Sequence, residues 1–193
     1  MKPPLPHAVR IIGGQWKRTP LRVPPGVPDL RPTPARVRET LFDWLGPAVA
    51  GARCLDAFAG TGALGLEAAS RGAGEVLLVE QDPRLVAALE AMRLKLAAAS
   101  VRVFRGDGVA TLARQAPGSI DLVFLDPPFG SALAVRALAE AARCAAPGGH
   151  VYLESAAEGP PCAGLDVHRR LRAGAVHATL YTAPPPLPSS RAP

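Results

Sequence analysis

The chain has 193 residues, of which 48% are hydrophobic, and it carries a formal net charge of +6. This length and composition are typical of one folded domain with its own apolar core, and they argue against a disordered chain. No uncharged apolar run approaches the roughly 20 residues of a membrane span, and no apolar signal region follows the first lysine. Three widely spaced cysteines without a CxxC pair argue against a disulfide framework or a zinc site. We therefore expect a cytoplasmic protein that binds neither a membrane nor a metal.

The excess positive charge lies in the first 40 residues. They hold eight basic and two acidic side chains, whereas the 14 basic and 14 acidic side chains of the remainder cancel. Clustered basic side chains release counterions from nucleic-acid phosphates, so this segment is a candidate RNA surface. A solvated arm without a partner is the alternative. The candidate RNA contacts are Arg10, Lys17, Arg18, Arg22, Arg36 and Arg38.

Residues 1–34 are predicted to form a small arm ahead of the main domain. Two short apolar-flanked runs between Val9 and Val23 favour a β-hairpin. Five prolines between residues 24 and 34 then indicate an extended connector. A helix is expected from Ala35 to Leu45, with Arg36 and Arg38 outside its apolar face. That face is formed by Val37, Leu41, Trp44 and Leu45.

From residue 35 onward, apolar runs of strand length alternate with helical patterns. This alternation predicts an α/β fold with a doubly wound, mostly parallel sheet, in a domain that spans residues 35–182. The last two runs indicate an antiparallel C-terminal hairpin, which brings the sheet to seven strands. The tail, residues 183–193, is rich in proline and serine and is expected to be disordered. The predicted strands are 53–57, 75–79, 101–105, 120–125, 150–154, 165–171 and 176–182, and the predicted helices 62–71, 83–96, 108–115 and 132–144.

A glycine-rich segment follows the first strand of this domain. Gly60, Gly62 and Gly65 fit the pattern GxGxxG, in which glycines let the backbone approach a ligand closely. Nicotinamide and flavin enzymes use the same pattern, so it does not by itself identify the ligand. Glu80 and Asp107 follow at the next two strand ends, where carboxylates can accept from the ribose hydroxyls and the adenine amino group of an adenosine. Together these signals predict an adenosine-binding slot.

The most specific motif is Asp126-Pro127-Pro128-Phe129, directly after the fourth strand of the domain. An exocyclic amine of a nucleobase is a poor nucleophile because its lone pair is delocalised into the ring. The Asp126 carboxylate and the Pro127 carbonyl can accept its two N–H groups, which directs the lone pair toward an activated methyl donor. Phe129 offers a stacking face, at about 1–3 kcal/mol per base. The motif predicts an amino methyltransferase with Asp126, Pro127 and Phe129 as catalytic residues.

Several strings resemble the bacterial 16S ribosomal RNA guanine-N2 methyltransferases of the RsmD type. They are residues 10–17, 30–33, 36–45, 55–68 and 126–129, and the likeness runs from about residue 10 to residue 181. The resemblance implies a class I methyltransferase, Rossmann-like fold with S-adenosylmethionine as its cofactor. It implies methylation of one guanine of 16S RNA, the guanine-966-type site, within the small ribosomal subunit or its assembly intermediate. It also implies that Arg31 and Thr33 lie near the methionine end of the cofactor.

The candidate cofactor contacts extend over the glycine segment and the strand ends, and we expect the protein to be a monomer. Near the C-terminus, Ala178 stands where the family often has an aromatic residue. A second basic cluster at residues 168–172 is either a further RNA surface or a solvated face. The candidate cofactor contacts are Arg31, Thr33, Asp56, Phe58, Ala59, Gly60, Gly62, Glu80, Gln81, Gly106, Asp107, Gly108 and Asp126.

Three other functions share part of this pattern. A nicotinamide-dependent oxidoreductase would use the glycine segment and Glu80, but it leaves the proline motif and the basic arm without a role. An adenine-N6 methylase acting on DNA or RNA would use the same proline motif, and only the N-terminal strings argue against it. A non-catalytic RNA-binding assembly factor would have no need of an intact slot and motif.

Overall fold

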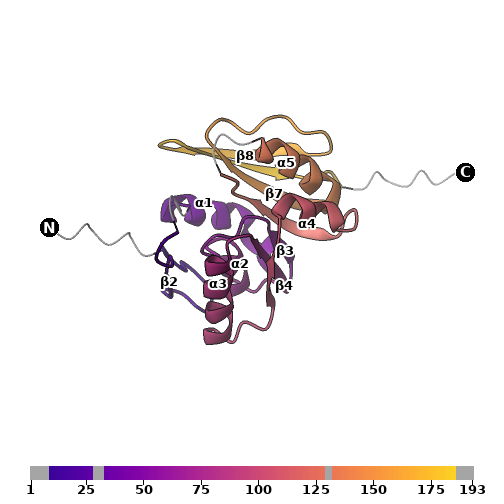
Figure 1. Cartoon of the computed structure of the whole chain (residues 1–193). Coiled ribbons are helices and arrows are strands. Elements are labelled where there is room, and N and C mark those ends of the chain that lie inside the picture. Colours follow the sequence, from indigo (N-terminus) through magenta and orange to yellow (C-terminus); the bar gives the residue numbers. More distant parts are fainter. Residues whose placement is uncertain (1–8, 28–32, 129–131, 186–193) are drawn as a thin grey trace, which may run out of the picture.

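A computed structural model of the chain describes residues 9–27, 33–128 and 132–185. Its centre is a twisted seven-stranded sheet in the order β5-β4-β3-β6-β7-β9-β8, with helices on both faces (Figure 1). The predicted α/β fold, with a mostly parallel sheet and an antiparallel C-terminal hairpin, is confirmed. The strands are β3 (Arg53–Asp56), β4 (Glu75–Glu80), β5 (Val101–Arg105), β6 (Ile120–Leu125), β7 (Ala145–Ser155), β8 (Asp166–Ala173) and β9 (Val176–Thr182).

The order of the strands creates a crevice at one end of the sheet. Strands β3 to β7 are parallel, and the chain runs outward from β3 to β4 and β5 before it returns to β6 on the other side of β3. At such a reversal the loops after neighbouring strands diverge, which leaves a ligand crevice at the carboxyl ends of the strands. Strand β9 is inserted antiparallel between β7 and β8.

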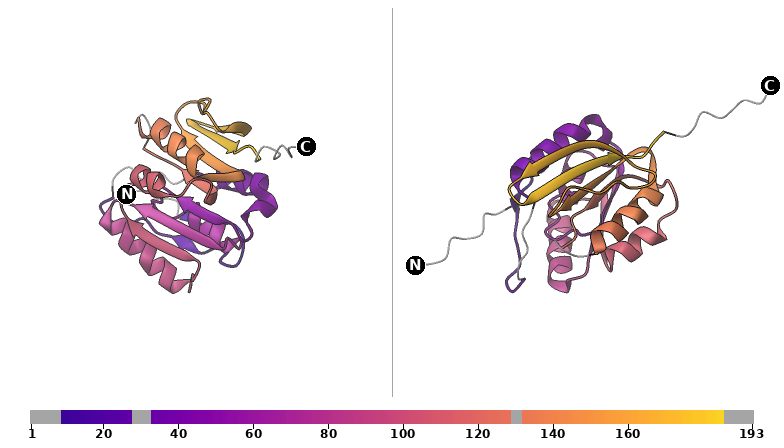
Figure 2. Two further views of the ribbon diagram at one scale, coloured as in Figure 1. Left: turned by 90° about the vertical axis from the view of Figure 1, so that its right-hand side faces the viewer. Right: turned by 90° about the horizontal axis from the view of Figure 1, so that it is seen from above.

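Helices lie on both faces of the sheet (Figure 2), and two apolar layers hold them against it. One layer buries Leu41, Leu66 and Leu89, which belong to the first three α-helices of the chain. The other buries Leu112 and Leu138 from the last two. The helices are α1 (Ala35–Leu45), the 3-10 helix η1 (Gly46–Val49), α2 (Gly65–Ser70), α3 (Pro83–Lys95), α4 (Gly108–Arg114) and α5 (Leu133–Cys144).

Most element bounds agree with the sequence patterns, and the differences have local causes. Helix α1 has the predicted ends, and α3 begins as predicted, with the Asp82 side chain accepting from the Arg84 N–H at 2.8 Å. Helix α2 is shorter than predicted because residues 60–64 form the turns of the glycine segment. The predicted disorder from residue 183 is wrong at its first residue: Ala183 is buried, and its N–H donates to the Gly149 carbonyl at 2.9 Å. Residues 186–193 lie outside the described part of the chain.

The predicted N-terminal hairpin is present and belongs to the main core. Strand β1 (Val9–Arg10) pairs antiparallel with β2 (Pro20–Leu21). Ile11 and Leu21 are buried in the same apolar layer as α1 and α2. The connection between the two strands, residues 11–19, lies against α2. The arm is therefore packed as a part of the domain and is not a loose appendage.

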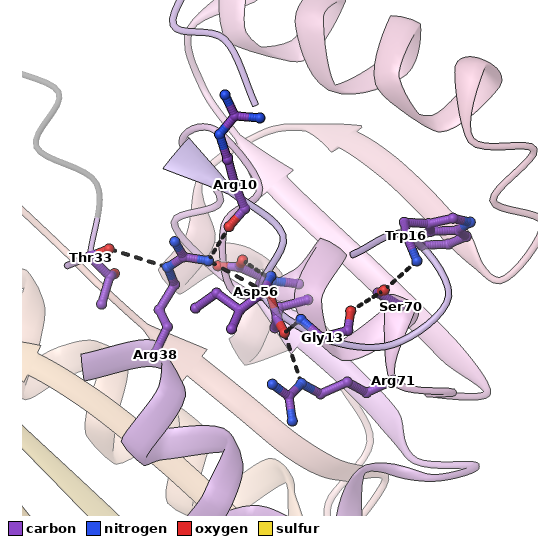
Figure 3. Close-up of polar contacts among 11 residues, drawn as sticks. Arg10, Gly13, Trp16, Thr33, Arg38, Asp56, Ser70 and Arg71 are labelled. Atoms are coloured by element: carbon purple, nitrogen blue, oxygen red, sulfur yellow. Dashed lines mark hydrogen bonds and ion pairs between the residues drawn. The ribbon is translucent and has the colours of Figure 1, made fainter. Parts of the chain in front are cut away.

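Ser70 on α2 contacts Gly13 and Trp16 of this connection (Figure 3), and Glu67 of the same helix also holds it in place. The Glu67 carboxylate accepts from the backbone N–H groups of Ile12 at 2.6 Å and Gly13 at 2.8 Å. The Ser70 hydroxyl donates to the Gly13 carbonyl at 2.6 Å and accepts from the Trp16 N–H at 2.9 Å. These bonds satisfy backbone groups that the short hairpin ladder leaves unpaired.

Arg38 is buried, and the prediction that it lies outside the buried face of α1 is wrong. Its side chain is 2% exposed. The guanidinium donates to the carbonyls of Arg10 at 2.9 Å and Thr33 at 3.2 Å, and it lies 3.7 Å from the fully buried Glu67 carboxylate. Positions 38, 41, 42 and 45 form one stripe at helical spacing, and this stripe faces the core. Arg38 therefore cannot serve as the predicted surface contact to RNA.

Candidate active site

A cavity of about 980 Å³ opens at the carboxyl ends of the parallel strands, at the reversal point of the sheet. Ten of the candidate cofactor residues line it, which brings together five separate segments of the sequence. Arg31 and Phe129 lie outside the described residues. The candidate residues on the cavity wall are Thr33, Asp56, Phe58, Ala59, Gly60, Glu80, Gln81, Gly106, Gly108 and Asp126.

The carboxylate of Glu80 holds the glycine segment in its conformation. Its Oε2 accepts from the Gly60 N–H at 2.9 Å, and its Oε1 accepts from the N–H groups of Gln81 at 2.7 Å and Asp82 at 2.9 Å. Gly60 has a φ of +53°, which a residue with a Cβ rarely adopts. A carboxylate has about four acceptor positions, so one remains for a ligand hydroxyl. We therefore expect Glu80 to bind one ribose hydroxyl more strongly than the other.

Asp56, the last residue of β3, has a buried oxygen that points to a missing partner. Its Oδ2 accepts from the Gly65 N–H at 3.0 Å, whereas Oδ1 has no hydrogen-bond partner among the described residues. Burial raises the pKa of this carboxyl to about 7. An ammonium group in the cavity would supply a partner for Oδ1 and would favour the ionised form. An amino acid moiety such as that of S-adenosylmethionine fits this requirement.

Two candidate residues do not line the cavity. Asp107 accepts from the Ala110 N–H at 2.7 Å as the N-cap of α4 and from the Gln81 Nε2 at 3.0 Å. Gly62 has a φ of +79° and packs against Leu66 and Leu89. Contact of either residue with a cofactor stays a prediction.

The other end of the cavity holds two acidic side chains close together. Asp126 follows β6 and Glu154 lies near the end of β7, and the register pairs their preceding residues, Leu125 and Leu153. The Thr33 hydroxyl lies 3.5 Å from Asp126 Oδ2, and the Tyr152 hydroxyl donates to Glu154 Oε2 at 3.0 Å. Pro127 and Pro128 line the same region.

Burial changes the acid–base properties of both carboxyls. It raises the pKa of Asp126 well above its ordinary value, and the negative charges of Glu154 and Asp56 raise it further. Burial also raises the pKa of Glu154. Three neighbours of Glu154 oppose this: the hydroxyls of Thr33 and Tyr152, and the positive charge of Arg38. The pKa of Glu154 is therefore raised less than burial alone would raise it.

Glu154 is the residue of the site that the sequence patterns miss. It is 2% exposed and lines the cavity. The signal that locates Glu80 and Asp126, an acidic residue at the end of a parallel strand, applies to Glu154 as well. A carboxylate at that position faces the same crevice, because the ends of parallel strands meet at one edge of the sheet.

The remaining basic candidates lie at the surface. Arg10, Lys17, Arg18, Arg22 and Arg36 are all exposed, on the hairpin and at the start of α1. No helix among the described residues is long and apolar enough to cross a membrane. Within the same residues, no three His, Cys, Asp or Glu side chains are grouped to hold a metal ion.

Comparison with known proteins gives consistent matches over the described domain. The family model described as Conserved hypothetical protein 95 matches residues 9–182. Ribosomal RNA small subunit methyltransferase D of Escherichia coli is 43% identical over 178 residues, which is 90% of this chain and 89% of the relative. A solved E. coli structure assigned to the methyltransferases has a TM-score of 0.82 at 39% identity and covers 93% of this chain and 99% of its own.

A more distant solved structure shares the fold alone. It is an RNA methyltransferase from Salinibacter ruber, solved in complex with S-adenosyl-L-homocysteine. Its TM-score is 0.61 at 17% identity, and the match covers 84% of this chain and 100% of that structure. Together with the E. coli structure at 39% identity, this confirms the predicted class I methyltransferase fold.

Proposed function

The chain belongs to the Conserved hypothetical protein 95 family, as do its relatives named ribosomal RNA small subunit methyltransferase D, and from this premise we propose that it methylates ribosomal RNA with S-adenosylmethionine. The observation that carries the proposal is the position of Asp126. Its carboxylate lines the same cavity as the glycine segment, with Thr33 at 3.5 Å and with the charges of both Asp56 and Glu154 acting on it. A methyl donor held by the glycine segment and a base bound in the same cavity would meet at this residue.

We propose further that the methylated atom is the exocyclic N2 of one guanine of 16S RNA, the guanine-966-type site. Bound S-adenosylmethionine supplies an activated methyl group. Asp126 and the Pro127 carbonyl accept the two N–H groups of the amine and so orient its lone pair. After transfer, Asp126 is placed to take the proton that the cationic amine releases. Phe129 is proposed to stack on the base.

The cavity wall formed by Asp56 and Glu80 supports the assignment of the methyl donor. The unpartnered Oδ1 of Asp56 suits the ammonium group of the methionine moiety, and Glu80 suits a ribose hydroxyl. We propose that Arg31 and Thr33 lie near the methionine end. Isothermal calorimetry distinguishes this from the nicotinamide alternative: binding of S-adenosylhomocysteine without binding of NAD is expected, and the reverse would contradict the proposal.

The exposed basic side chains are proposed to contact the RNA of the small subunit or its assembly intermediate, with the protein acting as a monomer. Changing Lys17, Arg22 and Arg36 to glutamate is expected to weaken RNA binding by at least tenfold. The plot of log affinity against log salt should become shallower by about one unit per lost phosphate contact. Affinity for S-adenosylhomocysteine should stay unchanged, because none of the three residues lines the cavity.

Arg102→Glu is the matched control for this triple variant. Arg102 is exposed on β5, at the opposite edge of the sheet from the C-terminal hairpin, and it does not line the cavity. Its charge reversal should leave the salt dependence of RNA binding near that of the wild type. The triple variant reverses three charges and the control one, so a loss in the control of about one third of that in the triple variant, in log affinity, would indicate that overall charge, and not the surface of the N-terminal hairpin, governs binding.

Mass mapping of small-subunit RNA tests the proposed reaction as a whole. RNA from cells that lack the gene should be short of one methyl group, and nucleoside analysis should identify the missing product as N2-methylguanosine. Loss of N6-methyladenosine would instead favour the adenine alternative, which the proline motif alone does not exclude. An unchanged methylation pattern would overturn the proposal.

A further inference from the structure

We propose that Glu154 reads the N1–H of the target base and thereby selects guanine over adenine. This inference rests on the proposed methylation of guanine at N2, and it adds a specificity residue to that site. The proline motif supplies acceptors for an exocyclic amine, and purines of both kinds carry such an amine. A second acceptor beside the first would distinguish the two bases, because the ring nitrogen next to the amine carries a hydrogen in guanine but not in adenine.

The structure places Glu154 beside Asp126 by backbone register. Strands β6 and β7 are parallel neighbours, and Leu125 pairs with Leu153, so Asp126 and Glu154 occupy equivalent positions on adjacent strands. Such strands lie about 4.8 Å apart. Both side chains line the same end of the cavity, together with Thr33. The two carboxylates therefore form a pair of acceptors side by side.

The Tyr152 hydroxyl restrains the Glu154 carboxylate, and its polar and charged neighbours offset part of the burial that disfavours its charge. The Tyr152 hydroxyl donates to Oε2 at 3.0 Å, which restricts the rotation of the side chain. The buried Arg38 guanidinium contributes a positive potential, and Glu154 in turn stabilises its charged form. An ionised carboxylate is an acceptor with no hydrogen to donate.

The edges of the two purines differ at the position that such an acceptor would meet. Guanine presents the N1–H and the N2 amino group as adjacent donors, which match two adjacent carboxylates. Adenine presents its N6 amino group beside N1, a ring nitrogen that is an acceptor. An ionised Glu154 would face the lone pair of that nitrogen without a hydrogen bond. Sites that hydrogen-bond a base edge reject a base that cannot complete the bond.

The test compares guanine with 2-aminopurine at the target position of reconstituted small-subunit particles. 2-Aminopurine keeps the amino group at C2, but its N1 is an acceptor and carries no hydrogen. Wild-type protein should methylate guanine about 10- to 100-fold faster under single-turnover conditions. In Glu154→Gln the amide can donate to N1, so the guanine preference should fall at least fivefold. The control Glu158→Gln changes an exposed carboxylate outside the cavity and should keep the wild-type preference.

Each outcome has a distinct meaning. Equal rates of the wild-type protein on guanine and 2-aminopurine would overturn the role of Glu154, and this result does not depend on the folding of any variant. An unchanged preference in Glu154→Gln would overturn it too. If wild-type protein forms no N2-methylguanosine on particles that contain guanine, the proposed function itself fails, and the base-reading inference fails with it.

Discussion

Asp126→Ala is expected to lower the rate of methyl transfer by about 10²–10³-fold while binding of S-adenosylhomocysteine changes little. Removal of one preorganised hydrogen-bonding group that acts in the transition state typically has this effect. Asp126 is placed to accept from the amine, whereas Asp56 and Glu80 remain to hold the cofactor. Single-turnover kinetics with labelled S-adenosylmethionine measures the first quantity, and calorimetry measures the second.

Asp121→Ala is the matched control for the Asp126 variant. Asp121 lies on the same strand, β6, but near its other end, where it pairs with Arg53 at 2.9 Å outside the cavity. We expect the control to keep a rate close to that of the wild type. A rate loss of similar size in both variants would show that the Asp126 effect is structural and would contradict its catalytic role.

The same carboxyl predicts a pH dependence. Burial, followed by the negative charges of Glu154 and Asp56, raises the pKa of Asp126. A carboxyl with a raised pKa stays protonated up to a higher pH than a free aspartate, and the ionised form is the better acceptor. The value of kcat/KM should therefore fall as the pH is lowered through this raised pKa. If kcat/KM fell only at the pH where an ordinary aspartate becomes protonated, the proposed environment of Asp126 would be contradicted.

The sequence patterns located the sheet and most of the site because both depend on local signals. Alternating apolar runs define the parallel strands, and a parallel sheet gathers the residues after each strand at one edge. Glu80 and Asp126 could be placed in one cavity on that basis. Glu154 also lies near the end of a parallel strand, but its position beside Asp126 depends on β6 and β7 being neighbours in the sheet. That neighbour relation follows from the strand order, and not from any string of residues.

Packing determined what the patterns could not predict. The charge of Arg38 favours an exposed position. In a helix of only 11 residues, the sequence pattern does not decide which side faces the core. The buried Glu67, 29 positions later in the chain, supplies the opposite charge that makes burial of Arg38 possible. The unpartnered Asp56 oxygen likewise appears only when the surroundings of its side chain are known. Contacts between distant segments leave no periodic trace in a sequence.

Arg38→Ala is expected to lower the free energy of unfolding by about 3–5 kcal/mol. Removal of one member of a buried ion pair leaves the other charge without compensation, and that is the usual size of the effect. Here Arg71, 2.8 Å from the fully buried Glu67 carboxylate, would keep part of the compensation, whereas the carbonyls of Arg10 and Thr33 would lose their buried donor, so we expect a loss toward the lower end of this range. Urea unfolding followed by circular dichroism measures the change. Arg36→Ala, two residues away on the exposed side of α1, should change the same quantity by no more than about 0.5 kcal/mol.

A double variant separates the ion pair from the other contacts of Arg38. In a Glu67→Gln background the buried negative charge is already absent, so Arg38→Ala should destabilise the protein by clearly less than it does alone. Equal destabilisation in both backgrounds would mean that the guanidinium acts through its carbonyl contacts and not through Glu67. Because Arg38 also holds the carbonyl of Thr33, whose hydroxyl lies 3.5 Å from Asp126, Arg38→Lys should lower methyl transfer even at temperatures where it stays folded. A lysine ammonium is a compact donor that cannot reproduce the planar fork spanning Arg10, Thr33 and Glu67.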